Sequence, residues 1–236
     1  MRYAVISDIH SNLEALRRVL TEIEGKHVDE IICLGDVVGY GANPDEVASL
    51  VRGIAKYTIM GNHDDAVHSE NTYTQVNAFA KAAIRYTRDI LSDENLEWIK
   101  NLPLTKKLDN VLLVHSAPSE PHEWKYVLSE ADARMELSSF QEKICLIGHT
   151  HIPVVFRKIL KGAVPGEPIG QMRELINVGS VGQPRDGDNR ASFGIIDTGT
   201  FVYEHFRLEY DIKTAADKIA AAGLPAFLAE RLYRGR

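Results

Sequence analysis

The N-terminal third of the chain alternates short apolar runs with stretches in which apolar residues recur every three or four positions. The runs predict strands at 3–6, 31–34 and 57–60, and the helical spacing predicts helices over 12–24 and 44–52. A glycine follows the first helix as a stop signal, and a proline suits the first turn of the second. This β-α-β-α-β order predicts a parallel sheet.

A strand-rich half follows two further helical patterns. Helices are expected over 74–91, over 92–101, where Ser92 suits the cap, and near 129–140. Branched and aromatic residues predict strands at 111–114, 144–147, 154–159, 173–178, 192–197 and 201–208.

The glycine- and proline-containing segment 161–171 is expected to be a loop, too short for a domain linker. An alanine-rich helix is expected from Lys213 onward, and the basic residues of 231–236 are expected to form a solvated tail. The whole chain, 1–236, is therefore expected to be one domain, of which 213–236 form the C-terminal helix and tail.

Composition and charge narrow the possible classes of function. The 236 residues are 44% hydrophobic and 25% charged, as in ordinary globular proteins. No apolar run approaches the roughly 20 residues of a membrane helix, and the first run is too short for a signal peptide, so a cytoplasmic protein is expected. The net charge of −6 disfavours a large nucleic-acid partner. Cys33 and Cys145 lie in apolar runs and are expected to be buried, reduced thiols.

Metal-binding side chains follow five of the predicted strands. They are Asp8 and His10, then Asp36, then Asn62 with His63 and Asp64, then His115, and finally His149 with His151. Because ligands of open α/β sheets bind beyond the carboxyl ends of the strands, these residues are expected to gather in space. Each residue alone could be ordinary turn or cap chemistry, but their recurrence at five strand ends predicts a metal site. Glycines at 35, 61 and 148 would allow close backbone approach beside the ligands.

The donor types indicate which metals fit. Carboxylate, imidazole and amide donors without thiolate suit Mn, Fe, Zn, Co or Ni better than a structural zinc or a calcium site. Seven of these nine side chains would already be too many ligands for one ion. Two divalent transition-metal ions that share a carboxylate fit this number, and Mn²⁺ is the first expectation. A pair of ions about 3.5 to 4 Å apart is suited to in-line phosphoryl displacement.

The motifs Asp8-x-His10, Gly35-Asp36-x-x-Gly39, Gly61-Asn62-His63-Asp64, His115 and Gly148-His149-x-His151 together resemble the calcineurin-like metallophosphoesterases. The short chain is most similar to their small bacterial and archaeal phosphodiesterases. The resemblance implies an α/β fold, a four-layer α/β/β/α sandwich of two mixed β-sheets flanked by helices. It also implies that one ion is bound by Asp8, His10, Asp36 and His151, and the other by Asp36, Asn62, His115 and His149.

The resemblance also implies a mechanism. A hydroxide bridging the two ions would attack the phosphorus in line, because metal coordination lowers the pKa of water to about 7. His63 would assist the leaving group or hold a phosphate oxygen, and Asp64 would orient the ring of His63. His149 and His151, although only two positions apart, would bind different ions.

The substrate is expected to be a small phosphodiester, with a dinucleoside polyphosphate such as diadenosine tetraphosphate, or a phosphomonoester, as alternatives. The protein Ser/Thr phosphatases of the superfamily carry Asp-Arg-Gly where this chain has Gly39-Tyr40-Gly41, which disfavours their activity here. The principal candidates for substrate binding are Asn12 and Arg185. The further candidates are Tyr40, His68, His122 and Arg190, each of which would otherwise be a loop residue facing water. The aromatic residues expected to pack are Tyr73, Tyr86, Trp98 and Trp124.

Two other classes of function compete with a phosphoesterase. A non-catalytic, metal-binding scaffold of the same fold would typically lack the histidine that matches His63, which this chain keeps. A redox or oxygen-activating site would have fewer ligands and an open facial triad. The sequence leaves the oligomeric state open.

Overall fold

The computed structural model describes residues 1–159 and 172–236, so the predicted loop at 161–171 lies outside the described residues. Its first sheet has the order β10-β9-β1-β2-β3. The strands are β1 (Arg2–Ile6), β2 (Glu30–Cys33), β3 (Ala55–Thr58), β9 (Ala191–Asp197) and β10 (Val202–Leu208). β1, β2 and β3 are parallel, as the β-α-β pattern predicts, and β9 and β10 add antiparallel pairings.

The second sheet has the order β4-β5-β6-β8-β7. Its strands are β4 (Thr105–Leu108), β5 (Val111–Val114), β6 (Ile144–Ile147), β7 (Val154–Ile159) and β8 (Met172–Asn177). The central strands β5, β6 and β8 run parallel, and β4 and β7 pair antiparallel at the two edges. Both sheets are therefore mixed.

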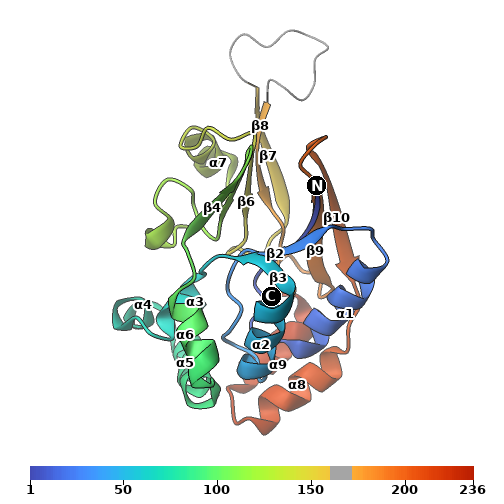
Figure 1. The fold of residues 1–236 in the computed structure, drawn as a ribbon. Coiled ribbons are helices and arrows are strands. Elements are labelled where there is room, and N and C mark those ends of the chain that lie inside the picture. The colour runs from blue at the N-terminus through green and yellow to red at the C-terminus, as the bar shows by residue number, and fades with distance from the viewer. Residues whose placement is uncertain (160–171) are drawn as a thin grey trace.

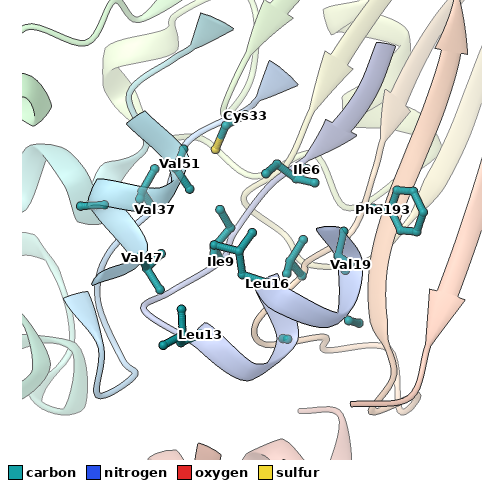
Figure 2. Packing of buried hydrophobic residues seen from close by; sticks show 14 of the residues in the cluster. Ile6, Ile9, Leu13, Leu16, Val19, Cys33, Val37, Val47, Val51 and Phe193 are labelled. Atoms are coloured by element: carbon teal, nitrogen blue, oxygen red, sulfur yellow. The ribbon is translucent and has the colours of Figure 1, made fainter. Parts of the chain in front are cut away.

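Three hydrophobic clusters hold four layers together (Figure 1). Residues such as Val5 and Leu113 interdigitate between the two sheets. Helices α1 (Leu13–Glu24) and α2 (Pro44–Ile54) cover the outer face of the first sheet, and Figure 2 shows Leu16 and Val47 in this layer. Helix α7 (Glu130–Glu136) covers the second sheet. The predicted four-layer α/β/β/α sandwich is confirmed.

The remaining helices gather at one end of the sandwich (Figure 1). They are α3 (Asn62–Ala66), α4 (Glu70–Gln75), α5 (Ala78–Ile90), α6 (Asp93–Lys100), α8 (Ile212–Ala221) and α9 (Ala226–Arg234), with a short 3₁₀ helix, η1 (Pro121–Glu123), elsewhere. Apolar residues of α5, α8 and α9 form a fourth cluster around Tyr40, which lies in the loop after β2. No helix in the described ranges is both long and apolar enough to cross a membrane.

Two predicted elements differ from the structure for local reasons. The single helix predicted over 74–91 is interrupted, because Val76 is extended and Asn77 caps α5 by accepting two backbone N–H groups with its side-chain oxygen. Strand β4 was not predicted, because its consecutive lysines, Lys106 and Lys107, mask the pattern of an edge strand.

Two further predictions about helices are wrong. The predicted helix at 129–140 is shorter, since α7 ends at Glu136. The basic segment 231–236 is not a free tail, because its first residues belong to α9, where Leu228 and Leu232 are buried four positions apart. Helix α9 ends at Gly235, which has a left-handed φ of 60°.

Candidate metal centre and active site

The predicted aspartate and histidine ligands converge from the loops that follow β1, β2, β5 and β6. One cluster of ligand atoms lies within 4.8 Å of one another and consists of Asp8, His10, Asp36 and His151. A second, equally tight cluster consists of Asp36, His115 and His149. We call these the first and second clusters. Because Asp36 belongs to both, its carboxylate has the position expected of a bridging ligand.

Backbone hydrogen bonds extend the sheet into this region and fix the loops. The N–H of Asp8 donates to the carbonyl of Gly35, and the N–H of His10 donates to that of Asp36, both at 3.0 Å. The carboxylate of Asp8 in turn accepts the backbone N–H of His149 at 3.1 Å. The loops after β1, β2 and β6 are thus held in one register.

The carboxylates lie between the imidazoles. Oδ2 of Asp36 is 3.5 Å from Nε2 of His10 and 3.4 Å from Nε2 of His115. Oδ1 of Asp8 is 3.2 Å from Nε2 of His151. These contacts bring carboxylate oxygens and imidazole nitrogens together in each of the two clusters.

Each histidine of the two clusters uses one ring nitrogen on a backbone carbonyl. The pairs are His10 Nδ1 with Val38 O (3.2 Å), His115 Nδ1 with Leu34 O (2.7 Å), His151 Nδ1 with Gln183 O (2.5 Å) and His149 Nε2 with Trp124 O (2.8 Å). A carbonyl only accepts, so these nitrogens carry the hydrogen. The opposite nitrogen of each neutral ring keeps a lone pair, which is the usual arrangement for metal-binding histidines.

Several polar atoms in the clusters have no satisfactory partner within the protein. Nε2 of His10 and Nε2 of His151 face each other at 3.1 Å, and with the tautomers above both present lone pairs. Oδ1 of Asn62 and Nε2 of His115 are buried without a hydrogen-bond partner among the described residues. A cation between such atoms would relieve both the repulsion and the unsatisfied burial. The residues present therefore fit a metal centre.

Burial and neighbouring charges shift the pKa values of the candidate ligands in different directions. Burial lowers the pKa of His149 to about 3, which keeps the ring neutral at neutral pH. Burial opposes ionisation of Asp36, but the neighbouring His115 and His63 outweigh it and hold the pKa of this carboxyl well below its usual range. For His115, burial is overcome by the Asp36 and Asp8 carboxylates, which raise its pKa to about 9. The buried carboxylates thus create a demand for positive charge.

The backbone is strained at most of the predicted ligands. Five of them have a left-handed φ: Asp8 (52°), His10 (50°), Asp36 (51°), His149 (68°) and His151 (62°). This region is uncommon for residues with a side chain, and such strain is concentrated at functional sites.

Close approach to the ligands requires glycine at two of the predicted positions. A Cβ at Gly61 would lie 2.2 Å from Oδ1 of Asp36, and one at Gly148 would lie 2.1 Å from Oγ of Ser7 and 2.4 Å from Oδ2 of Asp8. The carboxylates therefore occupy the space that a side chain would need.

His63 lies beside the first cluster. It is buried, and its ring centroid is 4.8 Å from that of His10 and 4.4 Å from that of Tyr40. Its backbone N–H donates to Oδ1 of Asp36 at 2.8 Å. Nδ1 is packed against Gly39, where a Cβ would come within 2.5 Å, so Nε2 is the nitrogen left to contact a substrate. Burial lowers the pKa of His63 to about 4.

The expectation that Asp64 orients the ring of His63 is wrong. The Asp64 carboxylate instead accepts the backbone N–H groups of Val38 at 3.2 Å and Gly61 at 3.0 Å. Nδ1 of His63 has no hydrogen-bond partner in the described ranges. Asp64 therefore joins the loop after β2 to the start of α3, because two amide donors outcompete a ring nitrogen that faces Gly39.

Comparison with known proteins agrees with this geometry. Residues 1–200 match the family model of the calcineurin-like phosphoesterase superfamily domain. The chain belongs to this superfamily. It is 40% identical to the uncharacterized protein MJ0912 of Methanocaldococcus jannaschii, over 99% of this chain and 98% of that protein.

Two solved structures resemble this superfamily member along its whole length. A metallophosphoesterase from Sphaerobacter thermophilus has a TM-score of 0.86 and 34% identity, over 100% of this chain and 99% of that one. The hypothetical protein PH1004 from Pyrococcus horikoshii OT3 has a TM-score of 0.83 and 21% identity, over 100% and 98% of the two chains. The predicted resemblance and the fold are both confirmed.

A cavity of about 330 Å³ opens beside the second cluster of this calcineurin-like protein. Asn62, His63 and His149 form its wall toward the metal ligands, and Trp124 and Tyr126 form another wall. The expectation that Trp124 only packs is incomplete. Trp124 also lines the cavity, and its backbone carbonyl accepts a hydrogen bond from Nε2 of His149. Tyr126 was not predicted, although its ring stacks on that of His149 with centroids 4.1 Å apart.

In the structure the Asn12 side chain is engaged in hydrogen bonds within the protein, and its predicted contact with a substrate stays a prediction. Its side-chain oxygen accepts the N–H of Ala15 and caps α1, while its amide nitrogen donates to Gly182 O at 2.9 Å and to the Tyr210 hydroxyl at 3.2 Å. These bonds occupy both amide hydrogens. Helix capping is the signal that explains its position in the sequence.

The other residues predicted to contact a substrate fall into two groups, those near the candidate metal centre and those away from it. Arg185 is half-buried, and Tyr40 lines the cavity. In contrast, His68, His122 and Arg190 are exposed, and each lies within 4.0 Å of a neighbouring acid: Asp65 (3.8 Å), Glu123 (3.3 Å) and Asp188 (2.7 Å), respectively. The last three are therefore not brought to the site.

Proposed function

We propose that this protein is a metal-dependent phosphoesterase that hydrolyses small phosphodiesters by in-line displacement at a dinuclear centre. The ions would be held by Asp8, His10, Asp36, Asn62, His115, His149 and His151. One observation carries the proposal: four buried histidines each have one ring nitrogen fixed on a backbone carbonyl, and in three of them, His10, His115 and His151, the other nitrogen lies within 3.5 Å of a carboxylate oxygen of Asp36 or Asp8. This is the arrangement of metal-binding histidines, in which the second ring nitrogen donates to a backbone carbonyl and so fixes the ring.

Divalent ions in such a centre supply a nucleophile at neutral pH, because they lower the pKa of water, and they neutralise phosphate oxygens. The mixture of oxygen and nitrogen donors without sulfur is compatible with Mn²⁺, which we propose, and also with Fe, Zn, Ni or Co.

The protein's own residues would orient the ester and assist its cleavage. Nε2 of His63 is the ring nitrogen not packed against Gly39, and His63 lines the cavity next to Asn62. From there it would donate to an oxygen of the phosphate or of the leaving group. The backbone bond from His63 to Asp36 keeps this imidazole in register with the bridging carboxylate.

The cavity supports a small substrate. Its volume of about 330 Å³ lies at the lower end of the range for ligand pockets, which is roughly 300–1,000 Å³. Its walls are mixed: Thr72 and Gln75 are polar, whereas Val76 and Ala80 are apolar. A nucleotide-sized ester would fit this surface.

A substrate panel tests the proposal. Metal-free protein would be loaded with Mn²⁺ and assayed with bis-p-nitrophenyl phosphate, p-nitrophenyl phosphate, a cyclic nucleotide and diadenosine tetraphosphate. We expect two bound ions per chain by metal analysis, faster turnover of a diester than of the monoester, and loss of activity with a chelator. Two bound ions without hydrolysis of any ester would instead support the scaffold function.

A further inference from the structure

Two arginines from distant parts of the chain meet at the ring of Tyr40. Cζ of Arg185 lies over this ring at 5.7 Å from its centroid, and Cζ of Arg231 lies over it at 5.6 Å. The same tyrosine ring is 4.7 Å from that of His10 and 4.4 Å from that of His63. Both guanidinium groups therefore contact a side chain, Tyr40, that itself contacts the predicted metal ligand His10.

The segments that carry these arginines are joined to each other. Gly187 donates its backbone N–H to the carbonyl of Gly235 at 2.9 Å, and the side chain of Asn189 donates to the carbonyl of Tyr233 at 3.1 Å. These bonds connect the loop after β8 to the end of α9.

The same loop is also joined to the metal ligands. The backbone N–H of Arg185 donates to the carbonyl of His151 at 3.3 Å, and Nδ1 of His151 donates to the carbonyl of Gln183. Packing and hydrogen bonds thus set the positions of both arginines relative to the first cluster.

Among the described residues, no Asp or Glu side chain lies within 4.0 Å of either guanidinium group. Arg185 donates from Nη2 to the neutral amide of Gln183 at 2.8 Å, and its Nε is buried without a partner. Arg231 donates from Nε to a main-chain oxygen of Arg236, the last residue of the sequence given. Burial, together with the positive charge of Arg185, lowers the pKa of Arg231 to about 10. Arg185 and Arg231 both lie over Tyr40 and have further N–H donors that no acidic side chain of the described residues accepts, so together they can offer these donors to an anion.

We propose that Arg185 and Arg231 form a second anion subsite, which binds a phosphate of the substrate other than the one that is hydrolysed. This inference rests on the proposed phosphoesterase function and narrows its substrate class. The preferred substrates are esters that carry a remote phosphate, such as phosphorylated nucleotide diesters and dinucleoside polyphosphates. The planar guanidinium groups provide several N–H donors in a geometry that matches phosphate oxygens.

A pair of matched substrates tests this subsite. Thymidine 5′-(p-nitrophenyl phosphate) and its 3′-phosphorylated form share the scissile bond and the leaving group, and differ only in the remote phosphate. We expect the Mn²⁺-loaded protein to prefer the 3′-phosphorylated form by at least about tenfold in kcat/KM, the size expected of charged hydrogen bonds. Arg231→Met, which keeps an unbranched apolar stem, should bring this preference close to one, and Arg231→Lys should restore part of it.

The control is Arg234→Met, an exposed position one turn further along α9, which should leave the preference unchanged. Absence of a preference in the unmodified protein, or a preference that survives Arg231→Met, would overturn the subsite. Equal losses on both substrates would also overturn it, because the arginines would then hold the scissile phosphate.

Binding of inorganic pyrophosphate to the metal-free protein gives a measurement that needs no turnover. By calorimetry at low salt, Arg185→Met and Arg231→Met should each weaken this binding by at least about tenfold, and Arg234→Met should not. Arginine-dependent binding by a protein that hydrolyses no ester would refute the proposed function and retain the subsite. Ester hydrolysis with pyrophosphate binding that is insensitive to both arginines would retain the function and remove the subsite.

Discussion

The two ligand clusters share Asp36 but differ in their access to the cavity. Asp8, His10, Asp36 and His151, the first cluster, are each at most 1% exposed, and none of the described residues that line the cavity belongs to it. In the second cluster, His149 lines the cavity next to Asn62. An ion in the first cluster would therefore be enclosed by protein, whereas an ion in the second would border the space for a substrate.

Replacing Asp36, the residue common to both clusters, should have the largest effect. Asp36→Asn removes the charge that serves both positions, and we expect kcat/KM for a diester to fall by more than about 10³-fold, since loss of a single stabilising contact already costs about 10² to 10³. Metal analysis should show fewer than two ions per chain. Retention of both ions and of activity would rule out a bridging carboxylate.

His63→Ala should lower turnover without loss of metal, because no predicted ligand nitrogen is removed. A loss of about 10²- to 10⁴-fold is expected for a group that assists proton transfer. The loss should be larger for an alkyl or nucleoside leaving group than for p-nitrophenolate, which departs without a proton. A metal content below that of the unmodified protein would instead make His63 a ligand.

A pair of single substitutions would separate the two clusters. Asn62→Ala should lower the affinity for one ion by about 10- to 100-fold, which is the loss measured when a residue that supports a metal ligand is removed. The other ion should stay bound. His151→Ala should release the enclosed ion and also destabilise the loop that carries Arg185. Titration of the metal-free variants with Mn²⁺ measures both affinities. A double variant that binds as many ions as either single variant would contradict the assignment of these residues to different ions.

Asn12→Ala should have the smallest effect on chemistry. Loss of the helix cap costs about 1 kcal/mol, and loss of the bond to Gly182 loosens the loop beside Asp8, because Gly182 donates its N–H to the carbonyl of Asp8 at 3.0 Å. Denaturant unfolding should therefore show lower stability, with kcat for a diester changed by less than about threefold. A large rise in KM at unchanged stability would restore Asn12 as a contact for the substrate.

Much of the candidate metal centre could be predicted from the sequence, because its ligands directly follow strands along the chain. A parallel strand brings whatever follows it to one edge of its sheet, so Asp8 and Asp36, which follow β1 and β2, could be placed together from strand ends alone. The roles of Asp64 and Asn12 could not be predicted, since each depends on which amide groups lie nearby after folding. Arg231 was missed for another reason: its partners, Tyr40 and Arg185, are distant in sequence and meet it only because Leu228 and Leu232 bury one face of α9.

The left-handed backbone at five candidate ligands bears on how a metal ion would bind. Each such residue costs on the order of 1–3 kcal/mol, and the structure that surrounds it must hold it in place. The packing around these loops therefore maintains the positions of the ligands, so that binding of an ion would require no change of backbone conformation. Metal affinity should accordingly fall when this packing is loosened, even by a substitution that removes no ligand.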